Sequence, residues 1–125
     1  MEEYIVKLMN CFDNSFINQN LEFVAHKDAN EYLRLEDCEN ELDVKCKVLE
    51  WFSRGACKTK PFGNRAKNNK FNWFMLNGIN SYLGTKFTKV DMEQIYTYLG
   101  NRCNHKRIIR FIESGYDISV LKEVE

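Results

Sequence analysis

The chain has 125 residues, of which 44% are apolar and 14% aromatic, so we expect one domain with a packed core over residues 1–125. Basic and acidic residues are equal in number at 18 each, and no apolar run approaches the roughly 20 residues that span a bilayer. The composition therefore argues against a membrane protein and against a strongly basic DNA-binding domain. The acidic start of the chain favours a cytoplasmic location over export.

The first elements are a predicted helix over residues 3–17 and a predicted β-hairpin over residues 21–36. The helix rests on apolar residues that recur at three- and four-residue spacing, namely Tyr4, Ile5, Leu8, Met9 and Phe12. The hairpin rests on alternation from Leu21 to Ala25 and on turn-forming residues at 27–30. A two-stranded hairpin is marginal alone, so it must lie on a helix.

A helix is predicted over residues 43–56, because Val44, Val48, Trp51 and Phe52 share one face. Glu50 and Arg54 are four residues apart, the spacing of an ion pair on the exposed side of such a helix. Residues 57–69 follow as a long basic loop that contains the single proline. A loop of this length in a compact domain is often functional.

Three further helices are predicted, over residues 70–83, 89–99 and about 105–114. In the first, the apolar face comprises Phe71, Phe74, Met75, Ile79 and Tyr82, and the other side comprises Trp73, Asn77 and Asn80. Thr88 with Asp91 has capping-box spacing, and Asn104 is a plausible N-cap. The fold class expected is α+β, predominantly α: a compact helical domain of four to five helices with one short N-terminal β-hairpin.

Catalytic and metal-binding signatures are absent from the sequence. The five cysteines lack the close pairs of a structural zinc site, so we interpret them as free thiols that pack as small hydrophobes. His105 falls on the apolar face of its helix and is expected to be buried. Cys103 would point away from it if both were helical. We expect no catalytic residue, no metal and no cofactor, hence a protein that is not an enzyme.

The charges are segregated along the chain. Residues 1–50 contain 12 acidic and 5 basic residues, whereas residues 51–90 contain 8 basic residues and no acidic one. The two parts could form a bipolar surface for partners or could dock against each other. The candidate partner-binding residues are Arg54, Lys58, Lys60, Arg65, Lys67, Lys70, Trp73, Arg102, Lys106, Arg107 and Arg110.

Two classes of partner fit these residues. An exposed Trp73 beside the basic segment is typical of a protein-binding module, which uses aromatic and arginine anchors. Alternatively, the 54–70 loop and the 102–110 helix could contact phosphates of DNA or RNA. Residues 70–99 have the proportions of a helix-turn-helix. Lys106, Arg107 and Arg110 are expected on the face opposite the apolar stripe of their helix.

Four segments give the chain a family resemblance over roughly residues 21–121. They are KVLEWFSRGACK (47–58), NGINSYLG (77–84), IYTYLGNRCNH (95–105) and FIESGYD (111–117). These resemble a family of small uncharacterised proteins from bacteriophages and prophages of low-GC Gram-positive bacteria. The resemblance transfers no functional residue, because no active site is assigned in that family.

The resemblance implies a setting in the host bacterial cytoplasm. Small accessory phage proteins without catalytic signatures often act by binding a host factor, which requires only a complementary surface. We therefore expect a non-enzymatic accessory protein that binds and inhibits or modulates a host macromolecule, of the anti-defence type (such as anti-CRISPR) or the host-takeover type. The partner is expected to be a host protein or nucleoprotein. A DNA- or RNA-binding regulator is the alternative.

Overall fold

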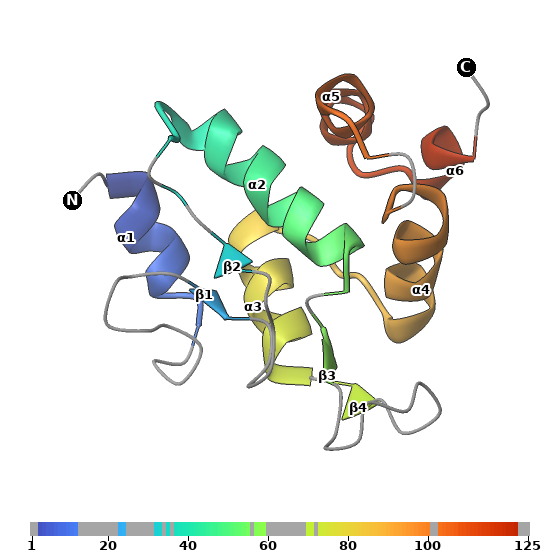
Figure 1. Ribbon diagram of the computed structural model, residues 1–125, viewed down its shortest axis with the longest axis horizontal. Coiled ribbons are helices and arrows are strands. Elements are labelled where there is room, and N and C mark those ends of the chain that lie inside the picture. The colour runs from blue at the N-terminus through green and yellow to red at the C-terminus, as the bar shows by residue number, and fades with distance from the viewer. Residues whose placement is uncertain are drawn as a thin grey trace.

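The computed structural model describes residues 3–12, 23–24, 32–33, 35, 37–55, 57–59, 70–71, 73–100 and 103–122. Six helices form in these residues, and four two-residue strands lie between them (Figure 1). Buried side chains from all six helices join one hydrophobic cluster. None of the helices in the described segments has the length and apolar character needed to cross a membrane.

Helix α2, Glu41–Ser53, is the central element of the fold (Figure 1). It packs against α1 (Glu3–Met9) and α3 (Trp73–Leu83) on one side, and against α4 (Lys89–Tyr98) and α5 (His105–Glu113) on the other. Asn40 caps its start by accepting a hydrogen bond from the backbone N–H of Asp43 over 2.9 Å. The predicted ion pair is confirmed, since Arg54 Nη1 lies 3.0 Å from Glu50 Oε1.

The connector between α3 and α4 is held by Asn80. Its side-chain oxygen accepts hydrogen bonds from Thr85 Oγ1 and from the backbone N–H of Phe87, each over 2.8 Å. Its amide nitrogen donates to the Phe87 carbonyl over 3.0 Å. The sequence placed Asn80 on an outward face of the helix. In the structure its side chain is half-buried and forms hydrogen bonds with the connector. The capping box of Thr88 and Asp91 that begins α4 is confirmed.

Helix α5 ends in a tight turn that packs a partly buried aromatic ring against the core. The N–H of Gly115 bonds to the Ile112 carbonyl and that of Tyr116 to the Phe111 carbonyl, which is the Schellman pattern. Tyr116 adopts a positive φ of 63°, and its ring packs edge-on against Phe111 and Phe87. Helix α6, Ile118–Leu121, follows directly and packs against α4 and α5.

The predicted α+β class is wrong, whereas its predominantly helical character is confirmed by the described residues. These residues form six helices rather than the four to five expected. Instead of a hairpin over residues 21–36, the described residues show backbone pairing of two residues on each side, β1 (Phe23–Val24) with β2 (Tyr32–Leu33). Such a ladder is too short to form a layer of its own. A second pair of equal length, β3 (Lys58–Thr59) with β4 (Lys70–Phe71), was not predicted.

Other parts of the N-terminal prediction need adjustment. The first helix spans Glu3–Met9, within the predicted 3–17, and Phe12 beyond it is buried against Trp51 at 6.1 Å between ring centroids. The turn residues predicted at 27–30, and most of the predicted loop at 57–69, lie outside the described residues.

Candidate functional site

The outward face of α3 carries the most exposed aromatic side chains among the described residues. Trp73 and Phe74 open the helix and are 57% and 74% exposed. The sequence placed Phe74 on the core face, so this assignment is wrong: the face actually buried is formed by Met75, Leu76, Gly78, Ile79, Tyr82 and Leu83. Asn77 and Ser81 are exposed beside the aromatic pair.

Helical geometry makes these four residues one continuous surface. At about 100° of rotation per residue, positions 73, 74, 77 and 81 fall within an arc of about 100° opposite the buried side. The arc extends about 12 Å along the helix at about 1.5 Å per residue. We call Trp73, Phe74, Asn77 and Ser81 the outer face of α3.

The outer face contains no charged residue, and neither does the rest of α3. This is unusual in a chain in which 29% of residues are charged. The lack of charge stands out more because the residues before the helix are basic. Strand β4, which carries Lys70, ends two residues before Trp73, and its partner β3 carries Lys58.

The β3–β4 pairing brings two of the predicted site residues together. Lys58 pairs with Phe71, and Thr59 pairs with Lys70, so the two lysines stand on adjacent strands but are offset by one residue, at positions that alternate between the two faces of the ladder. Arg54 is exposed at the end of α2 and engaged with Glu50. Four predicted site residues, Lys60, Arg65, Lys67 and Arg102, lie outside the described residues.

The prediction that Lys106, Arg107 and Arg110 form an outward cationic face on α5 is wrong for Arg107. Lys106 is exposed and Arg110 half-buried, but Arg107 is 6% exposed. Its Nη2 atom donates to the carbonyl oxygens of Tyr98 and Leu121. Arg107 lies one turn before Phe111 on the helix, about 40° from it, so its long side chain follows the apolar stripe inward. The four-residue spacing between Arg107 and Phe111 could have indicated from the sequence that Arg107 is buried.

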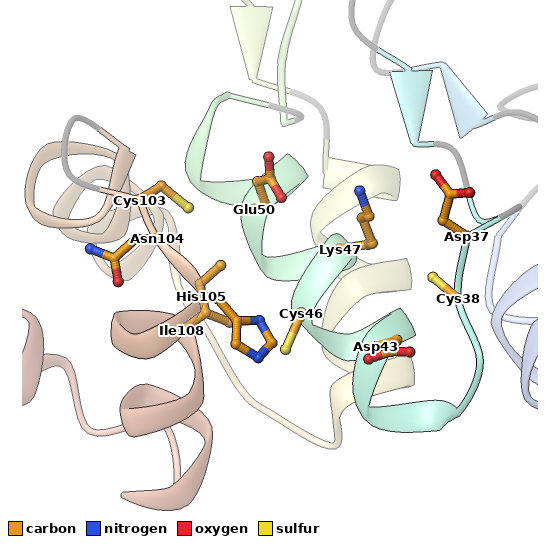
Figure 2. Close-up of a pocket in the computed structure, with 10 residues that line it drawn as sticks. All are labelled: Asp37, Cys38, Asp43, Cys46, Lys47, Glu50, Cys103, Asn104, His105 and Ile108. Carbon is orange, nitrogen blue, oxygen red and sulfur yellow. The ribbon is translucent and has the colours of Figure 1, made fainter.

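A second feature, absent from the sequence-based expectations, is a cleft of about 430 Å³ between α2 and the segments before α2 and α5. Three thiols line it, those of Cys38, Cys46 and Cys103 (Figure 2). Cys46 projects from α2 between Cys38 on one side and His105 on the other (Figure 2). Sequence spacing could not reveal this gathering, because the three cysteines come from separate segments.

The electrostatics of the cleft keep its thiols protonated. Burial raises the pKa of Cys46 to about 11, with the carboxylate of Asp43 acting in the same direction. Burial likewise raises the pKa of Cys38 and of Cys103. Since the thiolate is the nucleophile and the metal ligand, these thiols are poorly reactive near neutral pH.

Two polar side chains that line the cleft hold the backbone around it. Asp43 accepts a hydrogen bond from the backbone N–H of Glu39, and Asn104 caps α5 through the N–H of Arg107. Within the described part of the chain, no group of three or more histidine, cysteine, aspartate or glutamate side chains is arranged to hold a metal ion.

His105 and Cys103 differ from their predicted arrangement. His105, the first residue of α5, is exposed rather than buried. Cys103 precedes the N-cap Asn104, so the helical spacing argument does not apply, and both side chains line the same cleft (Figure 2). Cys103 also accepts a hydrogen bond from Ser53 over 3.9 Å.

Comparisons with known proteins add no relative: no family model, curated protein or solved structure matches the chain. The candidate site therefore stands on its own geometry.

Proposed function

We propose that the chain is a non-enzymatic phage accessory protein that acts in the host cytoplasm by binding a host macromolecule and inhibiting or modulating it. An anti-defence role, such as inhibition of CRISPR immunity, is one form of this proposal. The observation that carries it is the exposed, charge-free aromatic face at the start of α3, next to strands that carry Lys58 and Lys70.

The state of the thiols supports a non-enzymatic role. Cysteine and histidine side chains do line one cleft, and a nucleophilic enzyme would need such a pair within hydrogen-bond reach. Such an enzyme lowers the pKa of its thiol, whereas burial raises the pKa of Cys46 and Cys103 here. A binding protein needs a complementary surface and no activated group.

The alternative, a DNA- or RNA-binding regulator, receives less support. Arg107 is engaged inside the protein, and α4, the second helix of the predicted helix-turn-helix, presents Asp91 and Glu93 beside Lys89. Helix α4 packs against α2 and α6. A recognition helix instead needs a free, phosphate-compatible face.

Affinity capture from a lysate of a low-GC Gram-positive host tests the proposal. The wild-type chain is compared with the charge-reversed variant Lys58→Glu/Lys60→Glu/Arg65→Glu and with the double variant Trp73→Ala/Phe74→Ala. Val90→Ala is the matched control, since Val90 is another exposed apolar residue, on α4. We expect one host component that both multiple variants lose and the control retains. An identical capture profile for all four proteins would contradict the proposal.

Inhibition is tested separately from binding. Expression of the chain in a host with active CRISPR immunity is expected to restore plaque formation by the targeted phage if the anti-CRISPR form holds. Restoration that persists in Trp73→Ala/Phe74→Ala would show that the outer face of α3 is not the active surface.

A further inference from the structure

The composition of the outer face of α3 is that of the centre of a protein–protein interface. Interface centres are depleted in charged residues and enriched in aromatic ones, and charged residues form the rim. Trp73 and Phe74 supply the aromatic groups, and Asn77 and Ser81 extend the face with small neutral polar groups. The chain as a whole is 29% charged, so a helix face without any charged residue is uncommon in it.

The two aromatic side chains have the properties of binding anchors. Each large aromatic ring can bury roughly 150–250 Å². More than half of Trp73 and nearly three quarters of Phe74 remain accessible, so a partner can cover most of this area. Burial of exposed aromatic area at an interface centre typically dominates the binding energy, and tryptophan is the residue most enriched at such positions.

The charge of the chain on either side of α3 favours an acidic partner. Residues 51–90 contain no carboxylate, so nothing in the sequence around α3 repels an acidic surface. Strand β4 ends two residues before the helix and carries Lys70, and its partner strand β3 carries Lys58. Lys86 is exposed in the connector beyond its end. Opposite charges at a rim steer association and select partners.

The geometry favours a protein over a nucleic acid. Proteins that bind single strands stack successive bases on aromatic rings along a cationic groove. Trp73 and Phe74 are consecutive residues of a helix and therefore diverge by about 100°, which does not give two parallel stacking platforms. Helix α3 itself has no lysine or arginine to follow a phosphate backbone.

We infer that the outer face of α3 docks onto an acidic protein surface, with Trp73 and Phe74 entering an apolar depression bordered by aspartate and glutamate side chains. This inference rests on the proposed function and names the class of partner for the same site. The exposed face of a helix is a common docking element, and Asn77, which lies four residues after Trp73 and three after Phe74, continues the same face.

A display selection tests this inference. Random peptides of 16 residues are selected for binding to the immobilised full chain, and the affinity of individual synthetic peptides is then measured by isothermal titration calorimetry. Enriched peptides are expected to combine an apolar or aromatic residue with flanking aspartate and glutamate. Their binding to Trp73→Ala and to Phe74→Ala is expected to be at least tenfold weaker, and their binding to the control Val90→Ala within twofold of wild type.

The variants remain interpretable because their side chains are exposed. Urea midpoints close to that of the wild type are expected for all three, since surface substitutions away from the core change stability little. Enrichment of peptides without acidic residues, a selection that yields no binder, or affinities insensitive to both aromatic substitutions would overturn the inference.

A second experiment, with nucleic acids, distinguishes a failure of this inference from a failure of the proposed function. The same proteins are titrated with a fluorescent 20-nucleotide single strand and with a 20-base-pair duplex. Tight binding that weakens steeply with salt and is lost in Trp73→Ala would assign the face to nucleic acid, which overturns the inference but leaves a macromolecule-binding function standing. Failure of the proposed function appears instead as the absence of any specific capture from host lysate.

Discussion

The guanidinium group of Arg107 donates a hydrogen bond to the carbonyl oxygen of Leu121 over 2.8 Å. The same nitrogen donates to the carbonyl of Tyr98 over 2.9 Å. These two carbonyls belong to the last residues of α6 and α4, where the helical ladder leaves carbonyls without partners. A buried arginine therefore ties the ends of two helices to the helix between them in the sequence.

Loss of this arginine should destabilise the C-terminal part of the fold. Arg107→Met keeps much of the side-chain volume but removes both hydrogen bonds, so we expect a loss of about 2–4 kcal/mol in the free energy of unfolding. Urea denaturation monitored by circular dichroism measures it. The neighbouring exposed residue provides a control: Lys106→Met should change stability by about 0.5 kcal/mol or less. Equal effects of the two substitutions would contradict the assigned role.

Asn80 offers a test of the connector between α3 and α4. Asn80→Ala removes three hydrogen bonds to residues 85 and 87, and we expect a destabilisation of about 1–3 kcal/mol with faster amide exchange at Phe87. Asn77→Ala, at an exposed position on the same helix, serves as the control. Hydrogen exchange followed by NMR distinguishes them. Unchanged protection of the Phe87 amide in Asn80→Ala would show that the side chain is not what holds the connector.

Two glycines should respond differently to alanine. A Cβ at Gly100 would lie 2.5 Å from the backbone oxygen of Ser53, so the end of α2 and the α4–α5 connection would have to separate. We expect Gly100→Ala to cost about 2–3 kcal/mol. Gly84 has a positive φ of 71° but no atom within 4 Å of such a Cβ, so Gly84→Ala should cost only about 1–2 kcal/mol of backbone strain. Thermal unfolding of both variants compares them, and the reverse order would refute the close approach.

The stability should fall in alkaline solution. Burial raises the pKa of Cys46 to about 11 from an ordinary value of 9.0, so its contribution is complete below pH 9 and is lost as the pH rises through 11. Burial acts in the same direction on the pKa of Cys57 and of Tyr82. Urea unfolding under reducing conditions at pH 8 and pH 10.5 measures the loss. Cys46→Ala should show a smaller loss over this interval, and an equal or larger one would count against the assignment.

Several helices could be predicted from the sequence because their patterns are local. The apolar spacing around Val48 predicts α2, and the capping residues Thr88 and Asn104 mark the starts of α4 and α5 correctly. The ion pair between Glu50 and Arg54 could be predicted from their four-residue spacing on a helix alone. Each of these features is decided by residues within one or two turns of the chain.

The errors occur where a neighbouring element decides the outcome. Phe74 and Arg107 both lie at the edge of an apolar stripe, where periodicity does not determine which of the two turns inward. Phe74 remains exposed, whereas Arg107 is covered because the last carbonyls of α4 and α6 lie within its reach. The thiol cleft also depends on packing between segments far apart in the sequence, so spacing alone could not indicate it.

The candidate site was predictable only in part. The acid-free stretch and the exposure of Trp73 could be read from composition and helical position. The outer face of α3 could not be predicted as a whole, because Phe74 was assigned to the core face. Its exposure in the structure makes Trp73, Phe74, Asn77 and Ser81 one continuous surface. The short β3–β4 pairing that puts Lys58 and Lys70 on adjacent strands could not be foreseen, since two-residue ladders have no detectable alternation.

The five thiols differ in burial, and this difference allows the opening of the structure to be followed by chemical labelling. Cys46 and Cys57 are buried, whereas Cys11, Cys38 and Cys103 are half-exposed. In a native sample an alkylating reagent reaches the first two only when the structure opens. The mass of the labelled chain, followed over time, therefore separates molecules that have stayed closed from those that have opened even once, without any added probe.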